Sequence, residues 1–123
     1  MSCMSYLEQS YLSTCRAVEI LSGKCDNICV PIHHTSDYDL IVDAKGVISR
    51  VKVIRTECLA ESGAYIVNLR SAGKEGKQAF CPADCDFVFV DCPEGYYLIP
   101  VTSITQKRSI SLSRFLEYKV RLK

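Results

Sequence analysis

The sequence lacks any segment that would cross a membrane or direct export. No apolar run approaches the ~20 residues that a membrane-spanning helix needs. The first residues, MSCMSYLEQSY, contain no basic stretch followed by an apolar block, so they do not resemble a signal peptide. From these absences we expect a cytoplasmic, intracellular protein with no membrane contact.

Internal repeats, low-complexity segments and linkers are also absent from the 123 residues. A chain of this length without an internal boundary is typical of one domain with one hydrophobic core. The expected domain therefore spans residues 1–123.

The chain has little net charge, but its charge is unevenly distributed. The formal charge is +1 and the pI is about 7.5, which is low for a strong nucleic-acid binder. Residues 1–43 hold two basic and six acidic side chains, whereas residues 106–123 hold six basic side chains and one acidic one. An acidic half beside a basic tail suits a metal centre next to a phosphate-binding rim, and a solvated helix face explains it equally well. The candidate nucleic-acid contacts are Lys107, Arg108 and Arg114.

Cysteine, in contrast, is abundant, with eight residues. Without a secretory signal we expect reduced thiols, several of them buried. Two C-x3-C pairs, CDNIC at 25–29 and CPADC at 81–85, would form a zinc site together with His33 and His34, which leaves a zinc-stabilised interaction module as an alternative. Packing at the edges of strands explains the pairs too, so we expect no stoichiometric zinc.

Hydrophobic periodicity predicts one helix, several strands and a final helix. The first helix covers residues 4–22, with an apolar face made of Leu7, Tyr11, Cys15, Val18 and Leu21. The expected strands cover residues 27–32, 38–43, 47–56, 64–70, 86–91 and 96–101. The tail from residue 111 begins with serines that suit a helix cap. This order predicts an α+β domain with a mixed, antiparallel-rich central sheet flanked by helices.

One predicted hairpin, DYDLIVDAKGVISRVKVIRT at 37–56, carries the candidate chemistry. Residues two apart in a strand share a face, so the valines of its second strand are expected to face the core, with Arg55 on the same side. Asp39, Lys52 and Ile54 are then expected to lie around one cleft on the other side.

This hairpin resembles the core of the PD-(D/E)XK nuclease superfamily, and it is most similar to the small branch with intron-encoded homing endonucleases. That branch typically carries yDLivD…g…rVQVKrT at this place, with glutamine in the position of the acid. The later segment CDFVFVDCPEGYYLIPVTSI resembles the branch's D-apolar…yyliPv segment. The resemblance covers roughly residues 4–112 and implies a restriction-endonuclease-like core.

The resemblance also implies a set of site residues. Asp39 falls on the metal-binding aspartate, and Glu8 resembles the helix glutamate that helps to hold the metal, with Glu19 as a further candidate. Lys52 falls where the glutamine or acid belongs, and Ile54 falls where the lysine belongs. The candidate catalytic residues are therefore Asp39, Lys52 and Glu8, the candidate metal ligands are Asp39 and Glu8, and the implied cofactor is Mg²⁺.

Two functions follow from these assignments. One is a Mg²⁺-dependent DNA endonuclease of the homing type, in which Lys52 replaces the displaced lysine and the protein acts on double-stranded DNA as a homo-oligomer. The alternative is an inactive pseudonuclease that binds DNA or a protein target, as an inhibitor carried by a phage or mobile element. The loss of two motif positions together favours the second, and the extent of the resemblance favours the first. A fold by itself does not decide between them.

Overall fold

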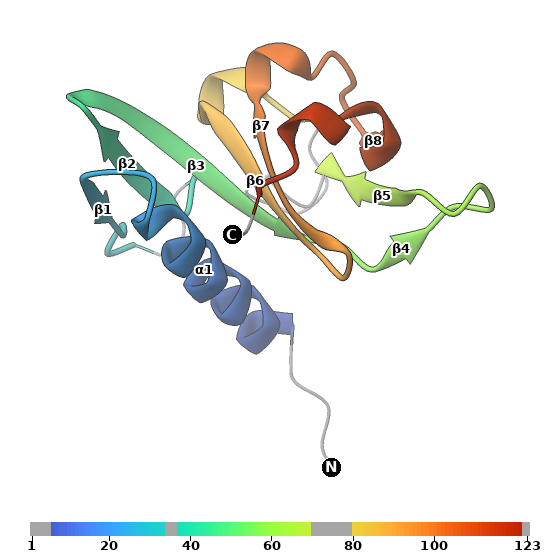
Figure 1. The fold of residues 1–123 in the computed structure, drawn as a ribbon, viewed down its shortest axis with the longest axis horizontal. Coiled ribbons are helices and arrows are strands. Elements are labelled where there is room, and N and C mark those ends of the chain that lie inside the picture. Colours follow the sequence, from blue (N-terminus) through green and yellow to red (C-terminus); the bar gives the residue numbers. More distant parts are fainter. Residues whose placement is uncertain (1–5, 34–36, 70–79, 122–123) are drawn as a thin grey trace.

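One helix and two sheets organise the chain in the computed structural model, which describes residues 6–33, 37–69 and 80–121 (Figure 1). Helix α1 spans Tyr6–Ser22 and lies against one face of the larger sheet. Within the described residues, no helix is long and apolar enough to cross a membrane.

The larger sheet has five strands in the order β1-β2-β3-β6-β7. The strands are β1 (Asn27–Cys29), β2 (Leu40–Ala44), β3 (Val47–Arg55), β6 (Phe87–Cys92) and β7 (Gly95–Pro100). Strands β3 and β6 run parallel, and the other neighbours are antiparallel. The predicted mixed, antiparallel-rich α+β fold is thus confirmed.

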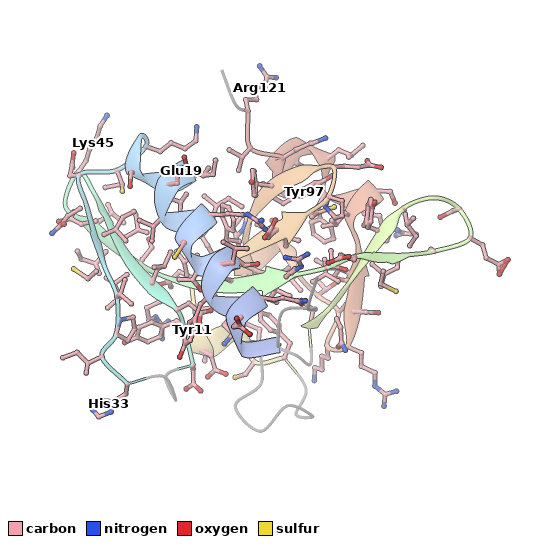
Figure 2. The ribbon with its side chains drawn as sticks, turned by 90° about the horizontal axis from the view of Figure 1, so that it is seen from below. Tyr11, Glu19, His33, Lys45, Tyr97 and Arg121 are labelled. Atoms are coloured by element: carbon pink, nitrogen blue, oxygen red, sulfur yellow. The ribbon has the colours of Figure 1, made fainter. Side chains whose placement is uncertain are left out.

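The turn between β2 and β3 fixes the register of the hairpin. Lys45 and Gly46 both have positive φ, 53° and 85°, which is the backbone of the two-residue turn that matches the twist of paired strands. The Gly46 N–H donates to the Asp43 carboxylate at 3.1 Å. Figure 2 shows Lys45 at the tip of this hairpin. The register pairs Ala44 with Val47 at the turn and Leu40 with Val51 at the far end.

A smaller sheet covers the second face of the larger one. It contains β4 (Cys58–Leu59), β5 (Tyr65–Asn68) and β8 (Ser109–Ser111) in that order. Short 3₁₀ turns follow β8 at Leu112–Arg114 and Leu116–Tyr118. The predicted final helix is therefore wrong. Ile110, Leu112 and Phe115 instead point into the core between the two sheets.

The described residues form two hydrophobic clusters, one on each face of the larger sheet. Under α1 lie Ala17, Leu21, Leu40, Val51 and Phe89. On the other face, β3 and β6 contribute Ile54, Val88, Val90 and Cys92 to a cluster shared with the smaller sheet. Parallel strands, such as β3 and β6 here, are commonly covered on both faces.

Two expectations about which residues are buried differ from the structure. The valine face of β3 is only partly buried, because Val47 lies at the hairpin end with 65 % of its surface exposed. The predicted apolar face of α1 is also displaced, because Tyr11 and Cys15 are exposed. The buried line of the helix is Ser13, Ala17 and Leu21.

Candidate functional site

The candidate site lies where β3 runs on past the end of β2. Strand β2 pairs with β3 only as far as Val51, so residues 52–55 extend beyond it. At that point the Asp39 main-chain N–H donates to the Val51 carbonyl at 2.8 Å. The Asp39 carboxylate oxygen Oδ2 then accepts the Val53 N–H at 2.7 Å. The carboxylate thus accepts the next main-chain N–H of β3 after the last residue of β2 that pairs with it. The register of the hairpin therefore determines the position of the Asp39 side chain.

Lys52 forms an ion pair with this carboxylate. Its Nζ lies 3.7 Å from Asp39 Oδ2, and the lysine side chain is only 16 % exposed. Lysine is rarely covered to this extent without an anionic partner. The same carboxylate oxygen therefore faces both a backbone N–H and an ammonium group.

A pocket of about 230 Å³ opens at this point between α1 and β3. Its lining residues are Gln9, Ser10, Ser13, Asp39, Lys52, Val53, Ile54, Arg55 and Glu57. The prediction that Asp39, Lys52 and Ile54 border one cleft is confirmed. Arg55 also lines the pocket, although alternation placed it on the far side. Its Nε donates to Glu57 Oε2 at 2.9 Å.

Ile54 borders the pocket but belongs mainly to the core. Only 5 % of its surface is exposed, and it packs in the cluster between the two sheets. It supplies no polar atom at the position where the resemblance expects a lysine. Any charged group introduced here has to turn out of the core toward the pocket.

The other predicted ligands lie outside this pocket. Glu8 is exposed in the first turn of α1, and its neighbour Gln9 lines the pocket instead. Glu19 lies near the opposite end of α1 from Tyr11 (Figure 2). Across the described ranges, no three His, Cys, Asp or Glu side chains lie close enough together to hold a metal ion.

The donor set at Asp39 does not fit a divalent cation. Mg²⁺ takes oxygen ligands, usually one or two carboxylates with waters and phosphate. Here one carboxylate faces Lys52, and the other acidic residue of the pocket, Glu57, pairs with Arg55. Two unit charges of the same sign 4 Å apart repel by about 4 kcal/mol at an effective dielectric constant of 20, and a dication doubles this. The Lys52 ammonium thus opposes the binding of a divalent ion at Asp39.

A buried charge cluster next to this pocket was not predicted. Asp91, on β6, accepts hydrogen bonds through Oδ2 from Ser13 Oγ at 2.7 Å and from Arg16 Nη1 at 2.8 Å. The side chain of Asp91 is 8 % exposed and that of Arg16 is 36 % exposed. The hydrogen bond to Asp91 raises the pKa of the Arg16 guanidinium, so the arginine stays charged. The signal in the sequence is an aspartate that ends the apolar run FVFV.

A second polar pocket, of about 350 Å³, adjoins this cluster. It is lined by Arg16, Arg55, Thr56, Glu57, Asp91, Cys92, Pro93 and Tyr96. Because Arg55 and Glu57 line both pockets, the two pockets are neighbours and together make one polar region beside α1. We call this the α1 groove.

The predicted nucleic-acid contacts lie elsewhere. Lys107, Arg108 and Arg114 are exposed, and none of them lines the α1 groove. The Lys107 and Arg108 carbonyls accept the N–H groups of Phe80 and Leu69, so this segment is anchored beside β8. Arg114 lies in the turn that follows β8.

The cysteines of the two C-x3-C pairs are not all buried, although packing at strand edges predicted that they would be. Cys85 is buried, and burial raises the pKa of its thiol to about 11. A thiol with this pKa is protonated near neutral pH, whereas zinc binding requires the thiolate. Cys29 and Cys81 are exposed, so core packing does not explain them. His33 lies on an outer loop away from α1 (Figure 2), and His34 falls outside the described residues.

Comparison with known proteins agrees with the resemblance of the hairpin. Residues 9–118 match the family model described as PD-(D/E)XK endonuclease. The solved structure of a bacterial homing endonuclease, I-Ssp6803I, is similar with a TM-score of 0.73, covering 95 % of this chain and 88 % of that chain. The identity is 22 %, so this likeness shows the fold alone. No protein of curated function matches the sequence. On the extent of the family match, the chain belongs to the PD-(D/E)XK endonuclease family.

Proposed function

We propose that this protein binds double-stranded DNA through an endonuclease fold whose cleavage site is inactive. The observation that carries the proposal is the ion pair between Lys52 and Asp39, 3.7 Å apart, because the resemblance assigns this aspartate to the metal. Family membership and the homing endonuclease neighbour support DNA as the ligand. A protein target is the alternative ligand, as for an inhibitor from a phage or mobile element.

Two features of the site support the loss of cleavage. Hydrolysis of a phosphodiester by a metal nuclease depends on a divalent ion that polarises the phosphate and activates water. Lys52 and Arg55 bring positive charge to the pocket where that ion needs oxygen ligands. Ile54 removes the cation that the family places beside the ion, and its side chain is buried in the core and supplies no polar atom to the pocket.

The same ion pair also suits an active enzyme of the homing type. Lys52 lines the pocket together with Asp39, which supports a role for its ammonium as a displaced catalytic lysine. In that alternative the protein is a Mg²⁺-dependent endonuclease, and Glu8 or another oxygen ligand completes the metal site.

A cleavage assay separates the two functions. We expect no nicking of supercoiled plasmid by the native protein in Mg²⁺ or Mn²⁺ beyond the level in EDTA. Metal-dependent cleavage that disappears with Lys52→Ala and with Asp39→Ala would establish the active enzyme instead. Lys45→Ala is the matched control, because Lys45 is an exposed lysine at the hairpin tip (Figure 2).

The basic segment near β8 is proposed to supply part of the DNA affinity. Charge reversal at Lys107, Arg108 and Arg114 should flatten the dependence of log K on log salt by about 0.9 for each lost phosphate contact. Fluorescence titrations of a labelled duplex at several salt concentrations measure this slope. Reversal of Lys24 and Lys45, both exposed, changes the net charge by −4 against −6 for the triple variant, and it measures the effect of charge alone at positions away from this segment. An unchanged slope in the triple variant would mean that the segment is only a solvated surface.

We also infer that the protein acts as a homo-oligomer. Strand β1 is at the edge of the larger sheet, and the exposed side chains of Val30 and Ile32 follow it. Edge strands with exposed apolar side chains are templates for pairing with another chain.

A further inference from the structure

We infer that Arg16 contacts a phosphate of the bound nucleic acid, as a second phosphate position in the α1 groove beside the Asp39 pocket. This inference rests on the proposed DNA binding. It adds a site that neither the hairpin motif nor the basic segment near β8 includes.

The first argument is the way in which Arg16 is held. Asp91 and Ser13 lie behind it, and the carboxylate accepts only Nη1 of the guanidinium at 2.8 Å. A guanidinium carries five N–H donors in a fixed plane, so others remain to meet an anion from the pocket side. Because Asp91 is 8 % exposed and Arg16 is 36 % exposed, the cation faces solvent and the carboxylate does not. A side chain fixed in this way loses little conformational entropy when a ligand binds.

The second argument is the continuity of the groove. Lys52 and Arg55 line one of its two neighbouring parts and Arg16 and Arg55 line the other, so a phosphodiester backbone laid across both parts would pass all three cations. Ser10 and Tyr96 add hydroxyl groups to the walls. Phosphate contacts from arginine, lysine and hydroxyl side chains are the usual means by which proteins position a nucleic-acid strand.

The charge of the groove sets a limit on how tightly it binds. Each of its three cations has a carboxylate partner: Lys52 has Asp39, Arg55 has Glu57, and Arg16 has Asp91. Binding here thus depends on directed hydrogen bonds and not on a large net positive charge. Glu57 is the more exposed partner of its pair and competes with phosphate for Arg55.

The main test compares two variants that leave the net charge unchanged. Arg16→Met with Asp91→Asn removes the proposed contact together with its carboxylate partner. Arg50→Met with Asp86→Asn is the matched control, because Arg50 is also paired with an aspartate and 38 % exposed but does not line the groove. With a fluorescent mixed-sequence duplex, we expect the first variant alone to lower the salt slope by about 0.9. Circular dichroism checks that both variants are folded.

A second measurement leaves Arg16 and its partners intact. Glu57→Gln frees Arg55 and should tighten duplex binding by up to about fivefold, which is the scale of one exposed ion pair. Glu61→Gln makes the same change of charge on an exposed residue outside the groove and should tighten it less.

The outcomes distinguish this inference from the proposed function. If duplex binding persists and both double variants keep the native salt slope, the phosphate contact at Arg16 is wrong while DNA binding stands. If Glu57→Gln binds no more tightly than Glu61→Gln, the phosphate backbone does not reach Arg55, and the path along the α1 groove to Arg16 is wrong. If the native protein binds no duplex, the proposed DNA binding fails and the inference fails with it.

Discussion

We expect that Lys52→Gln combined with Ile54→Lys will make this protein bind Mn²⁺ more tightly and nick plasmid DNA. The introduced glutamine places an amide oxygen beside Asp39 where an ammonium now lies 3.7 Å away. The introduced lysine comes from a residue that already borders the same pocket. One well-placed charge-stabilising group in an enzyme site changes the rate by about 10²- to 10³-fold, so we expect nicking at least 10²-fold above the native level. Calorimetry with Mn²⁺ and a plasmid assay measure the two effects.

The controls for this variant test whether the pocket acts as a unit. Adding Asp39→Ala should abolish both metal binding and nicking, and each single substitution should do less than the pair. Lys45→Gln with Ile48→Lys makes the same exchange at exposed positions of the hairpin and should gain neither property.

The experiment requires that the double variant remains folded, although Ile54 is a buried residue. Because Ile54 is 5 % exposed in the core between the two sheets, the introduced lysine costs stability unless its ammonium turns into the pocket. Thermal unfolding therefore accompanies the assay. A variant that remains folded and still binds no Mn²⁺ would mean that Asp39 is not a metal position in this chain.

The second large effect is on stability. Asp91→Ala should lower the free energy of unfolding by about 2–4 kcal/mol, because it leaves Arg16 and Ser13 without their shared acceptor. We place the range below that of fully buried pairs because Arg16 can still reach water. Chemical denaturation followed by circular dichroism measures the loss.

Two comparisons identify the cause of that loss. Asp86→Ala removes an aspartate that is 43 % exposed and paired with Arg50, and it should cost less than Asp91→Ala. Asp91→Asn retains an acceptor oxygen for Ser13 and should fall between native and Asp91→Ala. Equal losses for Asp86→Ala and Asp91→Ala would show that burial of the carboxylate contributes nothing.

The hairpin shows which features local sequence was able to predict. Alternating side chains define its strands, and the Lys45–Gly46 turn with positive φ sets their register. That register alone brings Asp39 alongside Val53 and Lys52, so the shared cleft follows from local spacing. The family pattern lies in the same segment, so the resemblance can be recognised from the sequence without knowledge of the tertiary structure.

The tail shows where local sequence was misleading. Serines followed by leucine, phenylalanine and charged residues suit the start of a helix, yet this segment forms β8 and two short turns. Strand β8 pairs with β5, and Leu112 and Phe115 fill the core between the sheets. A long-range pairing partner and a cavity to fill outweighed the local preference.

The sequence by itself determined the hairpin, its turn and the loss of two motif positions, because each depends on residues within about twenty positions of one another. It also determined the family, because the resemblance extends along most of the chain. Only the tertiary structure decided that both faces of β3 are covered, that Ile54 is a core residue, and that Arg55 lines the pocket. It alone joined Arg16 to Asp91, which lie 75 positions apart in the chain. Periodicity assigns a residue to a face, but it does not reveal what packs on that face or which distant charge lies beneath it.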